Sequence, residues 1–199
     1  MSYLFKKYEP HLFDDLIKLC ITALNDNKNK AKENMEVDDW ENKSHTVLHA
    51  LIKQKRFDLF HILYDNSEPI ACGGCYPSDF DKSFLMSCVR CYLHPEYRNQ
   101  HLIRKYFMPA DKGFAIQNNM NAIGLSFNIY NKGMMKIWER VRFGENRPYR
   151  DNLAFGSSNF NIIDFPIMIK NTPQYLCYES LNPEWSFNFE SIRANNETL

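Results

Sequence analysis

The chain has 199 residues, and 44% of them are hydrophobic, which is enough to bury a core of its own. Lysine and arginine together number 24, and aspartate and glutamate also number 24, so the formal net charge is zero. A neutral chain excludes the strongly basic classes, and we expect neither a nucleic-acid nor a membrane partner. The length predicts a single domain over residues 1–199 and leaves the oligomeric state open.

The compartment expected from the sequence is the cytoplasm. No apolar run approaches the roughly 20 residues that span a bilayer, and Met1–Lys7 has no hydrophobic signal region. The six cysteines are therefore expected to be reduced thiols.

The first elements predicted are a short strand and two helices. The strand covers Tyr3–Tyr8, and Pro10 is well placed at the start of a helix. The polar stretch Asn25–Asn34 predicts a loop, and Ser44 is a good N-cap for the second helix. The apolar stripes of the two helices recur at helical spacing: Leu12, Phe13, Leu16, Leu19, Cys20, Ala23 and Leu24, then Val47, Leu48, Leu51 and Ile52.

Three strands are predicted next, over Phe57–Tyr64, Ile70–Tyr76 and Phe84–Leu93, joined by short polar turns. The segment Asn99–Asn118 has a helical pattern. Pro109 lacks an N–H group, so we expect the helix to kink or break near its fourth preceding residue, Lys105.

The last third predicts a strand at Asn121–Ile129, a helix at Lys132–Arg142 and a loop at Gly144–Ser158. Two closing strands are expected at Asn161–Ile169 and Tyr175–Tyr178. The element order is then β-α-α-β-β-β-α-β-α-β-β. This predicts an α/β (α+β) fold, with a mixed sheet of about 6–7 strands and helices on both faces.

The most informative segment runs from Leu93 to Ile103. It reads Leu93-His94-Pro95-Glu96-Tyr97-Arg98, followed by Asn99-Gln100-His101-Leu102-Ile103. A buried strand ends here, a turn follows, and a helix begins. The start of a helix offers backbone N–H groups and a positive dipole end, so this arrangement suits a phosphate group.

These residues resemble the GCN5-related N-acetyltransferase (GNAT) superfamily. In that family a strand ends in V-x-P-x-Y-R, and R/Q-x-x-G-x-G/A follows at a helix start; Leu93–Arg98 matches the first part well. The later family pattern N-x-x-A-x-x-L-Y-x-K-x-G-F is matched in register by Asn131, Ile137 and Phe143. The resemblance is strongest over residues 57–143.

The resemblance implies an acetyl-CoA-dependent N-acetyltransferase that acts on a small-molecule or peptide amine. The strands Phe84–Leu93 and Asn121–Ile129 would be parallel neighbours that diverge at their C-terminal ends. Acetyl-CoA would be the co-substrate, and no metal is expected. The implied coenzyme-binding residues are Cys91, Tyr92 and Leu93 beside the pantetheine arm, Arg98, Asn99, Gln100, His101, Leu102 and Ile103 at the pyrophosphate, and Asn131 near the pantetheine.

The sequence also departs from the family pattern. His101 and Ile103 stand where the family has small residues, and Trp138 stands where many members carry a tyrosine proposed as general acid. A side chain at position 101 suits such a loop if the backbone keeps a negative φ. These departures favour an alternative, a protein that keeps the fold as a binding module without catalysis.

Acetyl transfer to an amine needs a base, because an ammonium cannot attack a thioester. His94 and Glu96 follow the central strand directly and are candidate bases, and a chain of waters is another. Tyr130, Tyr149 or the thiol of Cys88 or Cys91 are candidates for protonating the leaving thiolate.

Four cysteines support a third hypothesis, a small zinc-binding interaction protein. Cys72 and Cys75 form one C-x-x-C pair, and Cys88 and Cys91 form another. Both pairs lie in predicted strands, where residues three apart point to opposite faces. We therefore expect no zinc, with Cys72 and Cys75 on opposite faces of the sheet. A hairpin that paired Cys72 with Cys91 and Cys75 with Cys88 would put two thiols on each face.

Overall fold

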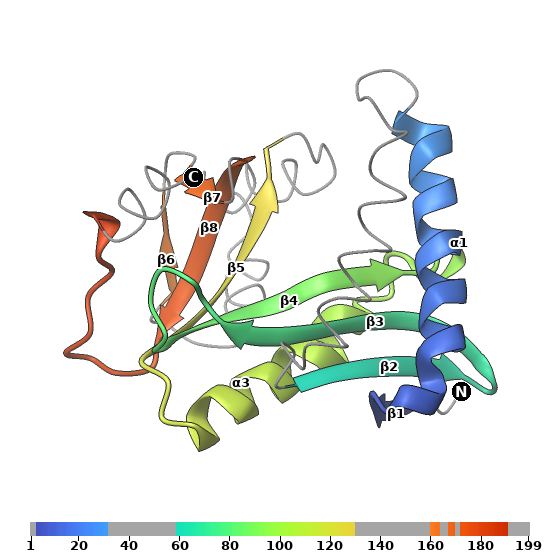
Figure 1. Cartoon of the computed structure of the whole chain (residues 1–199), viewed down its shortest axis with the longest axis horizontal. Coiled ribbons are helices and arrows are strands. Elements are labelled where there is room, and N and C mark those ends of the chain that lie inside the picture. Colours follow the sequence, from blue (N-terminus) through green and yellow to red (C-terminus); the bar gives the residue numbers. More distant parts are fainter. Residues whose placement is uncertain (1–2, 32–58, 130–159, 164–166, 170–171, 191–199) are drawn as a thin grey trace. The chain divides into compact units, whose positions relative to one another are not determined.

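The computed structural model describes residues 3–31, 59–129, 160–163, 167–169 and 172–190 (Figure 1). Three predicted elements lie outside the described residues: the helix after Ser44, the helix at Lys132–Arg142 and the loop at Gly144–Ser158.

Within the described residues, eight strands form one mixed sheet. Hydrogen-bonded neighbours follow the order β1-β2-β3-β4-β5-β8-β6, and β7 also pairs with β8. Their bounds are β1 Tyr3–Lys7, β2 Leu59–Asp65, β3 Glu68–Pro77, β4 Phe84–Leu93, β5 Ala122–Asn128, β6 Phe160–Ile162, β7 Ile167–Ile169 and β8 Thr172–Ser180. The predicted strand Asn161–Ile169 is wrong as one element, because β6 and β7 pair with different parts of β8. Pro166 lies between them in the sequence and has no N–H group for a ladder.

The helical segments in the described residues are η1 Pro10–Leu12, α1 Phe13–Ala31, η2 Pro95–Tyr97, the π-helix η3 Ile103–Phe107 and α3 Met108–Gln117. The loop predicted from Asn25 is wrong as far as Ala31, because α1 continues through this polar stretch. The break expected near Lys105 is present as the π-helical turn that precedes Pro109.

Strands β4 and β5 are adjacent and parallel, as the sequence predicts. Their ladder has three pairs, Phe84 with Ala122, Leu85 with Ile123 and Met86 with Gly124. Two residues later, Cys88 has a left-handed backbone with φ of 53°. This interrupts the regular alternation of β4, on which the predicted pairing of its cysteines depends.

The chain divides into two compact units. The first comprises residues 1–76 and 88–107, and the second comprises residues 77–87 and 108–199. A single domain stays a prediction, as does the divergence of β4 and β5, since the later part of β4 belongs to the first unit.

In the first unit the sheet buries side chains on both faces. Ile62 and Tyr64 of β2 join a core cluster with Leu16 and Leu19 of α1. Leu63, between them in the sequence, joins a second cluster with Leu102 and Phe107. Consecutive residues of β2 thus face opposite sides, and helical segments cover both.

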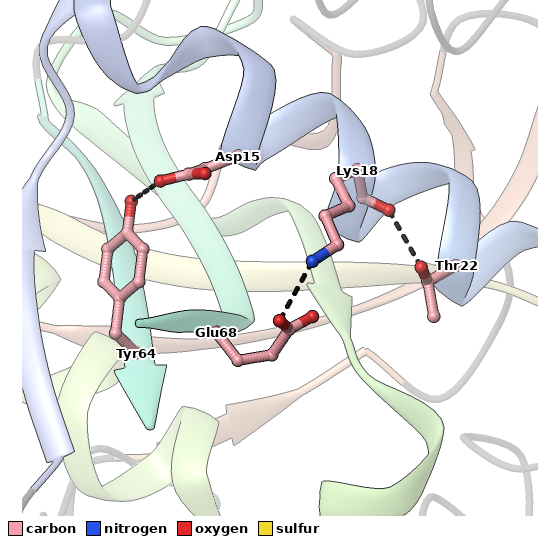
Figure 2. Close-up of polar contacts among 5 residues, drawn as sticks. All are labelled: Asp15, Lys18, Thr22, Tyr64 and Glu68. Atoms are coloured by element: carbon pink, nitrogen blue, oxygen red, sulfur yellow. Dashed lines mark hydrogen bonds and ion pairs between the residues drawn. The ribbon is translucent and has the colours of Figure 1, made fainter. Parts of the chain in front are cut away.

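Helix α1 crosses β2 and β3 (Figure 1) and is fixed to them by polar contacts beside its apolar stripe. Tyr64 Oη donates a hydrogen bond of 2.9 Å to Asp15, and Lys18 Nζ lies 2.9 Å from Glu68 (Figure 2). Burial and the bond to Asp15 raise the pKa of Tyr64 above its usual value. This hydroxyl therefore stays protonated and keeps donating.

In the second unit a polar layer ties α3 to the sheet. Ser87 Oγ donates a bond of 2.6 Å to the buried carboxylate of Asp111, and Lys112 Nζ lies 2.8 Å from Glu179 of β8. An aromatic cluster packs at the chain segment after β8: Phe80, Phe84, Tyr178, Trp185 and Phe187. Both features fix the elements that surround β5.

In the part of the chain that the structure describes, no helix is both long and apolar enough to span a membrane.

The first prediction concerns Gly124 of β5. A Cβ here would lie 2.5 Å from Cζ of Phe84 and 2.7 Å from the carbonyl oxygen of Cys177. Gly124→Ala should lower the free energy of unfolding by about 1–3 kcal/mol through overpacking. A Cβ at Gly113 in α3 meets no atom within 4 Å, so Gly113→Ala should raise stability by up to about 1 kcal/mol. Urea unfolding measures both, and equal effects of the two variants would contradict this packing.

A second prediction concerns His61 of β2, whose ring stacks on Phe5 at 4.3 Å between centroids. Burial, and to a lesser degree the charge of Lys7, lower the pKa of His61 from 6.5 to about 4. Between these values the unfolded chain binds a proton that the folded chain does not. The contribution of His61 to the free energy of unfolding is therefore fully present above pH 6.5, and it is lost as the pH drops toward 4. His61→Phe should reduce the loss of unfolding free energy between pH 7.5 and pH 5, by at most the amount expected for the binding of one proton. Unfolding experiments at these two pH values measure this difference. An unchanged dependence of stability on pH would show that His61 does not cause it.

Candidate functional site

The candidate site is the turn between the end of β4 and the helix that begins at Leu102. We call residues 94–101 the β4 turn. It belongs entirely to the first unit. Its start is fixed to β3, because His94 N donates a hydrogen bond of 2.8 Å to the carbonyl oxygen of Ile70.

Two tyrosine hydroxyls hold the β4 turn to neighbouring strands. Tyr97 Oη donates a bond of 2.9 Å to Asp65 at the end of β2. Tyr3 of β1 donates a bond of 2.8 Å to Oε1 of Gln100. The bond to Asp65 is the main cause that raises the pKa of Tyr97. The turn thus keeps its position relative to three strands.

Arg98 pairs with Asp26 of α1 through its Nη1 atom. The side chains are 29% and 26% exposed, so the pair is partly shielded from water. The sequence predicts a phosphate ligand for Arg98, and in the structure a carboxylate already contacts the guanidinium. Sequence reasoning missed Asp26 because its surroundings suggest a loop. Its spacing from Asp15, Lys18 and Thr22 on one helix face is the signal that could have found it.

His94 acts locally as the cap of η2. Its Nδ1 accepts a long hydrogen bond of 3.4 Å from the backbone N–H of Glu96, and its ring packs edge-on against Tyr97. In neutral His94 the proton is then on Nε2, and the lone pair that a base would use is engaged. Glu96 is exposed. Tyr130, the remaining predicted catalytic residue, lies outside the described residues, as do Tyr149 and Trp138.

The backbone of the β4 turn has an alternating pattern. Asn99 and His101 have positive φ values of 67° and 57°, and Gln100 between them does not. The condition under which a side chain suits position 101, a negative φ, is therefore not met. Alternation in the sign of φ is a feature of a nest, an arrangement in which successive N–H groups point to one side and attract anions. The helix follows at once, with Lys105 N bonded to the carbonyl oxygen of His101 at 3.0 Å.

Several predicted coenzyme-binding residues direct their side chains into the core. Leu102 is 1% exposed, and Ile103 and Leu93 pack against the same cluster. Tyr92 packs in the cluster under α1. Tyr92 and Leu102 therefore offer a ligand mainly their main chain, and Leu93 and Ile103 stay partly exposed. Asn131 lies outside the described residues.

The cysteines do not converge on one point. The β2–β3 register runs without a shift from Ala71 to Cys75, so alternation places Cys72 and Cys75 on opposite faces. Cys72 packs under α1 with Cys20, and burial raises the pKa of its thiol. A Cβ at Gly73 would lie 3.6 Å from Cβ of Cys91, so Cys91 lies beside Gly73. Within the described residues no three potential ligands form a metal-binding group.

No protein-family model matches the sequence, and no curated protein matches it. Solved structures do match in fold. The PaiA N-acetyltransferase of Thermoplasma acidophilum, in complex with coenzyme A, has a TM-score of 0.61 at 11% identity, over 90% of this chain and 99% of that chain. The chain has the acetyltransferase fold.

Two further structures agree. YncA of Salmonella typhimurium, with its cofactor acetyl-CoA, has a TM-score of 0.57 at 9% identity, covering 95% of this chain and 99% of that chain. The ribosomal-protein-S18-alanine N-acetyltransferase of Escherichia coli has a TM-score of 0.54 at 11% identity, covering 94% and 100%. The acetyltransferase fold therefore extends beyond residues 57–143, where the sequence motifs lie.

The third prediction concerns the left-handed residue His101. A residue with a Cβ costs about 1–2 kcal/mol in this conformation, and glycine does not. His101→Gly should therefore raise the free energy of unfolding by about 1 kcal/mol. His101→Ala removes the same imidazole contacts but keeps the Cβ, so it should give no gain. Equal stabilities of the two variants would show that the backbone conformation is not the cause.

Proposed function

We propose that this protein binds acetyl-CoA through the β4 turn and transfers the acetyl group to an amine. The observation that carries the proposal is the alternating φ pattern of residues 99–101 at the start of a helix, in the acetyltransferase fold. Both the nest and the helix dipole favour a diphosphate at this point. Two structures with this fold hold coenzyme A or acetyl-CoA.

The residues present fit the diphosphate through their main chain. Donors would come from the N–H groups of Gln100 to Ile103, with charge from the guanidinium of Arg98. The backbone at Cys91–Leu93 would pair with the pantetheine arm, and Asn131 would lie near it. The side chain at position 101 need not block this, because His101 is exposed. No metal is required by this chemistry.

In the reaction the amine nitrogen attacks the thioester carbonyl, the carbon–sulfur bond breaks, and coenzyme A leaves as a thiolate. The amine loses one proton and the thiolate gains one, so a base and an acid are needed. Glu96 is the better placed of the two candidate bases after β4, since the cap engages the lone pair of His94. Tyr130 is a candidate acid. Most of the rate enhancement would come from positioning.

The acceptor is proposed at the level of its class, a small-molecule or peptide amine. One structure with this fold is named for acetylating an alanine of ribosomal protein S18. A binding module without catalysis is the second candidate function. It is favoured by the engagement of both His94 and Arg98 in contacts within the protein.

Calorimetric titration with coenzyme A and acetyl-CoA tests the proposal. We expect saturable binding of both, and Arg98→Ala should weaken it roughly 10- to 100-fold, the scale of a lost bond to a charged group. Lys82→Ala removes an exposed charge in the second unit and should leave the affinity unchanged. Mass spectrometry of a panel of amines incubated with acetyl-CoA then separates enzyme from binding module. Absence of coenzyme binding would refute the enzyme and leave the binding module as the better account.

A further inference from the structure

The ion pair between Arg98 and Asp26 joins the β4 turn to a distant segment of the chain. Asp26 lies 72 residues before Arg98, in the second half of α1. It continues the polar stripe of Asp15, Lys18 and Thr22 seen in Figure 2. The stripe therefore makes contact with β2, with β3 and finally with the β4 turn.

Arg98 is the cation that the proposed coenzyme site needs for its diphosphate. In the structure a carboxylate contacts the same guanidinium, and about a quarter of each side chain is exposed. Partial shielding from water makes charges interact more strongly than on an open surface. A carboxylate and a diphosphate are both anions, so they repel each other when both approach Arg98.

We propose that Asp26 is a built-in competitor for the coenzyme. It contacts Arg98 in the structure, and the diphosphate must displace it or bind against its charge. Asp26 thereby lowers the affinity of the protein for the acetyl donor, acetyl-CoA. This inference rests on the proposed function, because it concerns the same site.

The opposite role would be positioning, in which Asp26 holds Arg98 in the orientation that binds phosphate. The two roles predict opposite changes in coenzyme affinity when the charge of Asp26 is removed. Removing the charge of a competitor tightens coenzyme binding, and removing a positioning partner weakens it. Asp26→Asn is the informative change, because the amide keeps the size and one acceptor oxygen and removes the negative charge.

Calorimetry with coenzyme A at low salt measures the effect on the full chain. Asp26→Asn should bind about tenfold more tightly than the wild type, and the gain should shrink as salt screens the charges. In the Arg98→Ala background the same change should give less than a threefold gain. Asp14→Asn is the matched control. It removes a carboxylate from the same helix about 18 Å away along the axis, at 1.5 Å per residue, and should leave the affinity unchanged.

Pantetheine, which lacks the diphosphate, serves as a second probe. Wild type and Asp26→Asn should bind pantetheine with the same affinity. Tighter binding of pantetheine by Asp26→Asn would show that the effect does not depend on the phosphates and Arg98.

Equal or weaker coenzyme binding by Asp26→Asn would overturn the competitor role and leave the proposed function standing. Binding by Asp26→Asn alone would support the competitor and contradict a working site in the wild type. Binding by neither would refute the inference together with the proposed function. Circular dichroism of each variant verifies that α1 remains folded.

Discussion

The geometry of the candidate site depends on one constraint: the β4 turn is held by contacts from four elements far apart in the sequence. The carbonyl oxygen of Ile70, Asp65, Asp26 and Tyr3 all bond to it. Left-handed residues with side chains are costly, and they persist where the surroundings fix the backbone. The backbone shape of the turn, on which the proposed anion binding depends, is therefore a property of the whole first unit.

The sequence predicts the sheet well where a strand is one continuous apolar run. Strand β4 has the predicted bounds, and β5 differs by one residue at each end. Prediction fails where a distant contact overrides local composition. The second half of α1 is rich in Asn and Lys, yet it is helical, and there the ion pair of Asp26 with Arg98 adds a tertiary contact.

For the site, the sequence locates the turn but not what its side chains contact. The Pro-x-Tyr-Arg pattern correctly places a turn and a helix start after β4. It predicts neither the positive φ of His101 nor the partner of Arg98. The backbone handedness of a non-glycine residue such as His101 is set by the contacts on either side of it. The salt bridge of Arg98 joins residues 72 positions apart in the sequence, and such a contact leaves no periodic signal.

These features together limit what the β4 turn can recognise. The flanking side chains of Tyr92 and Leu102 are in the core. The turn itself offers backbone N–H groups, the guanidinium of Arg98 and the exposed side chains of Asn99, Gln100 and His101. Such donors respond to the charge and shape of an anion more than to the rest of a ligand. A left-handed His101 in place of a glycine raises the conformational cost of the turn. The charge of the turn depends on Arg98 and on the carboxylate of Asp26 that contacts it. In the proposed function, the balance between these two residues would decide how strongly the turn attracts a diphosphate.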